Sequence, residues 1–185
     1  MRDEPGGARA APALRTARLL LRTWRDDDAP ALAAINADPE VGRYLNNPLD
    51  DGSGLSVSER IRAHWERHGF GHYALEELAP ADRGPARLLG FAGVGYPSFI
   101  AELADRPEIG WRLDSAVWGR GYATEAAHAT LDDARERLRL EELISIIHPD
   151  NARSQRVAEK LGMTIERQVR HPALGTDIDV WRIAL

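Results

Sequence analysis

The feature that most constrains this chain is a glycine turn between an apolar segment and an amphipathic helix. The turn, Trp118–Ala126, follows Glu108–Leu113, a short segment that we expect to be a strand. After the turn, apolar residues recur at helical spacing at Ala127, Leu131, Ala134 and Leu138. The first N–H groups of a helix lack internal partners and the helix dipole attracts anions, so the turn predicts a phosphate or pyrophosphate site. The alternative is an ordinary glycine-rich connection whose helix is capped by Thr124.

Two common phosphate-binding motifs do not fit this turn. A P-loop needs a lysine followed by serine or threonine after its last glycine, but the only lysine of the chain is Lys160. A dinucleotide-binding fingerprint needs a third glycine or alanine, and Thr124 stands at that position after Gly119 and Gly121. Such a fingerprint also belongs in the first strand–helix unit of its fold, whereas this turn lies past the middle of the chain.

The rest of the chain predicts a single domain of alternating strands and helices. We expect strands at 18–22, 72–76, 88–95, 108–113, 143–147, 163–169 and 178–184, and helices after Asp28, from Ser58, after the glycine turn and after Asn151. The apolar run 143–147 indicates a central strand buried on both faces. This order is typical of one α/β (α+β) domain over residues 14–185, and the segment 1–13, rich in Ala, Gly, Pro and charge, is expected to be disordered.

Composition excludes several functional classes. A net charge of −5 and a pI of about 5.7 give no electrostatic basis for binding nucleic acid. The sequence has no apolar run of transmembrane length and no signal-peptide pattern, so we expect no membrane association and a cytoplasmic protein. Without cysteine, no acyl-cysteine intermediate can form. His64 and His68 have helical i, i+4 spacing but no third ligand, so we expect a surface pair and no metal.

Several ordered motifs resemble the GNAT acetyltransferases, and in particular their RimJ/RimL-like branch. The glycine turn resembles the acyl-CoA pyrophosphate loop Gln/Arg-x-x-Gly-x-Gly/Ala, with Gly121 and Ala123 in the last two fixed positions. Trp118 replaces the usual glutamine or arginine, a departure that is typical of the RimJ/RimL-like branch. The further motifs are Arg18–Arg22, Leu89–Gly93, Glu108–Trp111, Asn151–Ser154 and Lys160–Met163.

The resemblance implies both a fold and a donor substrate. The fold is a mixed, mostly antiparallel sheet, flanked by helices and splayed between its fourth and fifth strands, here 108–113 and 143–147. The donor is acetyl-CoA. The residues implied to bind it are Trp111, Arg112, Leu113, Gly119, Arg120, Gly121, Tyr122, Ala123, Thr124, Asn151 and Ser154. The backbone of 111–113 would pair with the pantetheine arm, as an added strand does.

Acetyl transfer to an amine also needs a base and a group near the leaving thiolate. Ser154 matches the branch at the thiolate position, and its alternative role is that of a plain first-turn serine beside the N-cap Asn151. Glu108 is the candidate base, and its alternative role is an edge carboxylate paired with an arginine. His148 or a water chain could replace Glu108 as the base, and Glu102, Asp105, Asp177 and Asp179 could form an acidic entrance.

The sequence therefore predicts an N-acetyltransferase that moves acetyl from acetyl-CoA to a primary amine in a ternary complex. The acceptor is a protein N-terminus or a small amine, and the segments expected to face it are 45–56 and 97–107. A homodimer is left open. The alternative is a CoA-binding module that has lost catalysis and serves as a sensor or interaction domain.

Overall fold

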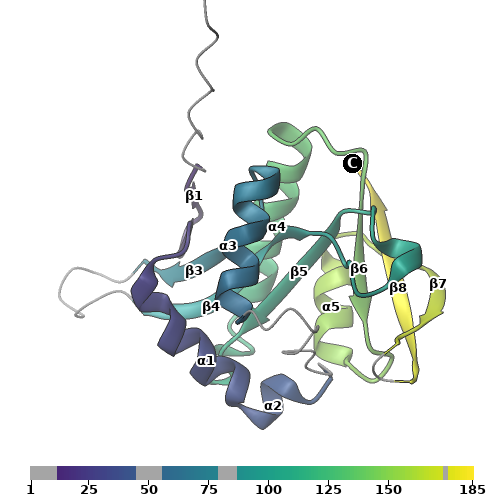
Figure 1. Ribbon diagram of the computed structural model, residues 1–185, viewed down its shortest axis with the longest axis horizontal. Coiled ribbons are helices and arrows are strands. Elements are labelled where there is room, and N and C mark those ends of the chain that lie inside the picture. Colours follow the sequence, from purple (N-terminus) through teal and green to yellow (C-terminus); the bar gives the residue numbers. More distant parts are fainter. Residues whose placement is uncertain (1–11, 45–55, 79–86, 173–174) are drawn as a thin grey trace, which may run out of the picture.

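The computed structural model describes residues 12–44, 56–78, 87–172 and 175–185, which form one sheet with helices on both faces (Figure 1). The strands are β1 (Leu14–Arg15), β2 (Leu19–Arg22), β3 (His72–Glu77), β4 (Leu88–Gly95), β5 (Glu108–Leu113), β6 (Glu142–Ile147), β7 (Thr164–Arg170) and β8 (Asp177–Ala184). The helices are α1 (Ala29–Ala37), α2 (Pro39–Gly42), α3 (Val57–His68), α4 (Tyr122–Glu136) and α5 (Ala152–Lys160). The sheet order is β1-β2-β3-β4-β5-β6-β8-β7, and only β5 and β6 pair in parallel.

The predicted strands and helices are confirmed, with differences at short elements. The two-residue β1 and the four-residue α2 were not expected, because elements this short leave no periodic pattern. Helix α3 begins at Val57, one residue before the expected start at Ser58, since Ser56 and Glu59 form a reciprocal capping box. The predicted disordered segment 1–13 and the acceptor-facing segment 45–56 lie almost wholly outside the described residues.

The two faces of the sheet bury different side chains. On the face covered by α4 and α5, here called the α4 face, Leu131 and Ala158 pack against strand residues such as Ile109 and Leu143. On the opposite face, here called the α3 face, Leu32 of α1 and Ile61 of α3 pack against strands β3 and β4. The connection between β4 and β5 closes the α3 face over β6 and β8 through Ile100 and Leu103. Successive side chains of β5 therefore point alternately to the α4 face and to the α3 face.

The sheet opens between β5 and β6. Their register contains one pair, Glu108 with Ile144, whereas β4 and β5 pair along the whole of β5. Because β5 and β6 run in the same direction, they diverge from this pair toward Leu113 and Ile147 (Figure 1). This confirms the mixed, splayed sheet that the resemblance implied, and we call the opening the fork. None of the helices in the described ranges is long and apolar enough to span a bilayer.

Candidate active site

The glycine turn presents an uncapped helix end beside β5. Gly119 and Gly121 have φ of +77° and +83°, a region where a side chain is strained, and Gly121 is the N-cap of α4. No side chain caps this helix start, whereas Ser56 caps α3 and Asn151 caps α5. The helix begins before Thr124, so the alternative in which Thr124 is the N-cap is wrong. The first N–H groups of α4 are left for an anion.

The connection between β1 and β2 fixes the turn from behind through Arg18. The Nη1 group of Arg18 donates to the carbonyl oxygen of Arg120 at 2.8 Å, and its guanidinium lies 4.5 Å from the centre of the Tyr122 ring. Since the two polar groups of a trans peptide point in opposite directions, this contact turns the N–H of Gly121 away from Arg18.

The carboxylate of Glu125 completes this brace. It accepts from Thr16 Oγ1 at 2.6 Å, from the backbone N–H of Arg18 at 2.9 Å and from Arg18 Nε at 2.7 Å. Burial would raise the pKa of Glu125, but these hydrogen bonds outweigh it and hold the pKa below its usual value. Sequence reasoning missed the brace, because its partners lie 102 to 109 residues apart in the chain.

Glu108 lies at the vertex of the fork. Its carboxylate accepts a hydrogen bond from the backbone N–H of Ile146, two residues beyond the one β5–β6 pair. Burial raises the pKa of Glu108 to about 7, and the Ile146 hydrogen bond opposes that rise. No arginine pairs with Glu108 among the described residues, which removes the alternative role of an edge salt bridge. A carboxyl group with such a pKa is suited to taking a proton near neutral pH.

The residues predicted to bind CoA lie along the open side of β5 and continue into the turn. Trp111 and Leu113 pack on the α4 face, and the indole Nε1 of Trp118 donates to the carbonyl oxygen of Leu113 at 2.9 Å. Arg112 points the other way, toward α1 and α3, where it donates to Asn36 Oδ1 at 2.6 Å. The remaining predicted positions, Gly119, Arg120, Gly121, Tyr122, Ala123 and Thr124, follow in sequence at the start of α4.

Asn151 and Ser154 lie on the opposite side of the fork, where α5 follows β6. The Oδ1 of Asn151 accepts from the backbone N–H of Ser154 at 3.2 Å, so Asn151 is the N-cap. Ser154 is half-buried. His148 also lies here: its ring stacks on Tyr44 with 5.3 Å between centres, and its Nδ1 accepts from the backbone N–H of Asp150.

A buried histidine that the sequence did not single out lies on the α3 face. His72 begins β3, and a Cβ on Gly110 would lie 3.2 Å from its Nε2, and one on Gly95 3.1 Å from its Cε1. The glycines of β4 and β5 therefore form a bare surface under this imidazole. Burial, helped by the nearby His64 and Arg112, lowers the pKa of His72 to about 3, so the ring is neutral at physiological pH. The signal in the sequence that could have revealed this histidine site is the pair of glycines, Gly95 and Gly110, on two predicted strands.

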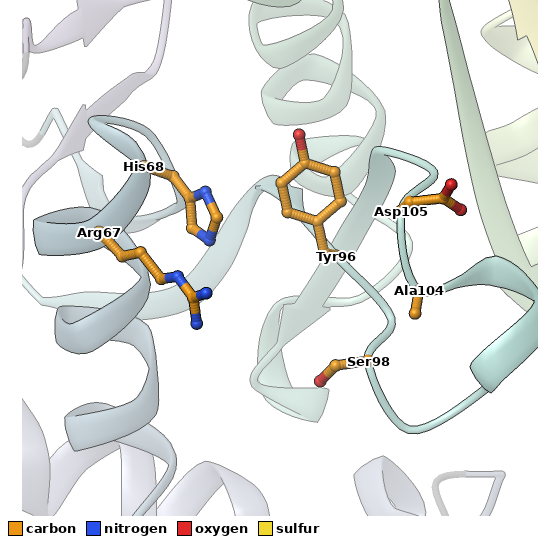
Figure 2. Close-up of a pocket in the computed structure, with 6 residues that line it drawn as sticks. All are labelled: Arg67, His68, Tyr96, Ser98, Ala104 and Asp105. Atoms are coloured by element: carbon orange, nitrogen blue, oxygen red, sulfur yellow. The ribbon is translucent and has the colours of Figure 1, made fainter.

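An open hollow of about 360 Å³ lies on the α3 face near the start of β5. Figure 2 shows Tyr96 in the middle, with Arg67 and His68 of α3 on one side and Asp105 on the other. The rings of His64 and His68 are 4.4 Å apart and both contact Tyr96, so the expected surface pair is part of an aromatic cluster. Among the described residues, no three side chains of His, Cys, Asp or Glu are grouped as metal ligands.

Comparisons with known proteins agree with this geometry. The acetyltransferase (GNAT) domain profile matches residues 18–164. The uncharacterized N-acetyltransferase YnaD of Bacillus subtilis is 39% identical over 153 residues, which cover 83% of each chain. An acetyltransferase from Agrobacterium tumefaciens shares the fold with a TM-score of 0.74 and 29% identity over 99% of both chains. RimL, a ribosomal L7/L12 α-N-protein acetyltransferase in complex with coenzyme A, has a TM-score of 0.72 at 16% identity over 94% of this chain and 98% of its own. The chain belongs to the GNAT acetyltransferase family.

Proposed function

We propose that this chain is an acetyl-CoA-dependent N-acetyltransferase with Glu108 as the base for the acceptor amine. The observation that carries the proposal is the Glu108 carboxylate at the vertex of the fork, half-buried and with its pKa raised to about 7. An ordinary amine is mostly protonated at neutral pH, so attack on the thioester requires a group that takes its proton.

Acetyl-CoA fits the fork in one direction. Its pyrophosphate meets the uncapped start of α4, from Gly119 to Thr124, and its pantetheine arm runs along the backbone of 111–113 toward Glu108. The thioester then lies between Glu108 on β5 and the start of α5, with Asn151 and Ser154. A backbone N–H of β5 polarises the thioester carbonyl.

The reaction is a direct attack in a ternary complex. The amine nitrogen forms a bond to the acetyl carbon, the carbon–sulfur bond breaks, and Glu108 takes the amine proton. The Ser154 hydroxyl donates a hydrogen bond to the departing thiolate. We assign the chain to the RimJ/RimL-like branch and to the cytoplasm, with a protein N-terminus or a small amine as acceptor. The proposal is compatible with a homodimer and includes neither nucleic acid nor a membrane as a partner.

The first experiment is a panel of primary amines with acetyl-CoA, followed by release of free CoA thiol. Turnover of at least one amine is expected. CoA binding without turnover of any amine would favour the catalytically inactive binding module instead.

The second experiment assigns the base. With an acceptor in hand, Glu108→Gln should lose the acidic limb of the rate profile near pH 7, and its remaining rate should rise with pH as solvent takes the proton. The matched control is Glu102→Gln, an exposed carboxylate paired with Arg167 outside the fork, which should keep the parent profile. An unchanged profile in Glu108→Gln would move the base to His148 or to a water chain.

The third experiment tests the thiolate contact. Ser154→Ala should lower turnover by roughly 10- to 100-fold with little change in affinity for acetyl-CoA, because the contact forms mainly in the transition state. A fully active Ser154→Ala enzyme would return this serine to a structural role in the first turn of α5.

A further inference from the structure

The side chain of Arg112 leaves β5 on the α3 face, away from the core under α4. Its guanidinium lies 5.3 Å from the centre of the Phe91 ring, and Nη1 donates to Asn36 Oδ1 at 2.6 Å. Trp111 and Leu113 face the opposite way. Because side chains alternate along a strand, Arg112 shares its face with Glu108 and Gly110.

The charge of Arg112 is poorly compensated within the described residues. Its Nε atom is buried and has no hydrogen-bond partner, and no described carboxylate lies within 4.0 Å of its guanidinium. Burial, together with the nearby Arg60, lowers the pKa of Arg112 to about 10, so the group remains positive at neutral pH. A buried charge without a counterion is costly, and proteins usually pair it.

The same fold contains an arginine that is fully compensated. Arg22 is buried between two carboxylates, with Asp28 at 2.7 Å and Glu76 at 2.6 Å. The half-buried Arg112 contacts the neutral amide of Asn36 and the ring of Phe91, but no carboxylate among the described residues. This contrast indicates that Arg112 is kept for a partner that comes from outside the described structure.

We propose that Arg112 binds a carboxylate of the acceptor, which makes the acceptor an amine-bearing carboxylate. The inference rests on the proposed function and names the substrate class for the same site. Asn36 occupies Nη1, so the Nε edge of the guanidinium is the side that can bind a carboxylate with two hydrogen bonds.

The positions of the two charged groups suit such a molecule. Glu108 and Arg112 share one face of one strand, with Cα atoms about 13 Å apart at the usual strand rise. Gly110 lies between them on that face, and the neutral imidazole of His72 covers it, because a Cβ on Gly110 would lie 3.2 Å from His72 Nε2. Glu108 and Arg112 are therefore on either side of the position that this ring covers. An acceptor that gives its amine to Glu108 and its carboxylate to Arg112 would span the His72 ring.

The test compares aminocarboxylates with their neutral amides. Beta-alanine, 4-aminobutyrate and 6-aminohexanoate are each assayed against the corresponding carboxamide, and kcat/KM is measured by CoA release. We expect at least one carboxylate to exceed its amide by about 10- to 100-fold, as a charge-assisted pair at a half-buried site implies. The ratio is used because it cancels changes in folded fraction and in acetyl-CoA binding.

Three variants locate the preference. Arg112→Gln should bring the ratio close to one, and Arg112→Lys should keep part of it, since lysine retains the charge without the two-pronged geometry. Asn36→Asp should also lower the ratio, because it places a carboxylate of the chain on Arg112. The matched control is Arg67→Gln, which removes an exposed arginine from the neighbouring hollow of Figure 2 and should leave the ratio unchanged.

The outcomes separate this inference from the proposed function. Equal kcat/KM for carboxylates and amides in the parent, or a preference that survives Arg112→Gln, overturns the carboxylate site. A preference lost in Arg67→Gln but not in Arg112→Gln overturns it as well, and moves the anion site to the hollow. Failure to turn over any amine, including peptides and neutral amines, contradicts the proposed function instead.

Discussion

At the scale of single residues, the titration of Glu108 makes the stability of the fold depend on pH. Burial raises its pKa from 4.5 to about 7, so the folded state binds this proton more tightly than the unfolded state does. The free energy of unfolding should therefore fall as pH rises from about 4.5 through 7, by roughly 3 kcal/mol at most. Glu108→Gln has no such proton, so its stability relative to the parent should increase between pH 5 and pH 8, measured by urea denaturation.

The control for this prediction is Glu102→Gln, the same substitution at an exposed carboxylate. Its denaturation midpoints should follow those of the parent at every pH. Parallel curves for the parent and Glu108→Gln would show that Glu108 titrates normally and would remove the physical basis for its role as base.

The conformation of a residue could be predicted where the local sequence determines the backbone. Two glycines before an amphipathic helix predicted the turn, and Gly119 and Gly121 do have positive φ. The contacts of Arg112 and Arg18 could not be predicted, since Asn36 is 76 residues away from the first and Glu125 is 107 residues away from the second. The position of a charged residue in a strand predicts the face of the sheet on which its side chain lies, but it does not predict the residue that the side chain contacts.

At the scale of elements, the connection between β1 and β2 orients the turn that precedes α4, and this can be tested through Arg18. Arg18→Met removes the hydrogen bond to the Arg120 carbonyl and the ion pair with Glu125, so the N–H groups of the turn lose their fixed direction. The Kd for CoA should rise about 10-fold, equivalent to about 1.4 kcal/mol, in isothermal titration. Pantetheine, which lacks the phosphates, should bind both proteins equally. An equal loss for pantetheine would mean that Arg18 acts only through general stability.

The matched control is Arg135→Met, which removes an exposed arginine from α4 that pairs at 3.9 Å with Asp132 one turn away. It should bind CoA as the parent does. The boundaries of the strands explain why the sequence did not predict the contacts that Thr16 and Arg18 make with Glu125 and the turn. The strand expected at 18–22 begins at Leu19, and Thr16 and Arg18 lie in the short connection after β1, which itself was not expected.

At the scale of the whole molecule, the order of strands and helices followed from periodicity, but the fork did not. Apolar alternation predicts that β5 and β6 are strands, but it does not predict that they share a single pair. Only the resemblance to GNAT proteins predicted the splay. An open fork leaves backbone groups of β5 unpaired until a ligand completes them, and this gives the ligand a large influence on stability.

Acetyl-CoA should therefore stabilise the whole domain, because it binds the folded state alone. At a concentration 100 times its Kd the gain is about 2.7 kcal/mol, which corresponds to roughly 5 to 10 °C in Tm for a domain of this size. ATP and NAD at the same concentration should give little shift, since the turn lacks their motifs. Gly121→Val should keep the apo fold but lose the shift, because a β-branched side chain is strained at a φ of +83° and its Cβ would lie 3.4 Å from Arg18 Nη2, in the contact that orients the N–H groups of the turn. The control Gly175→Val, at a positive-φ glycine with open space around it, should retain the shift. A Gly121→Val protein that is still stabilised by acetyl-CoA, or a parent that responds more to NAD, would contradict the assignment of the turn to CoA.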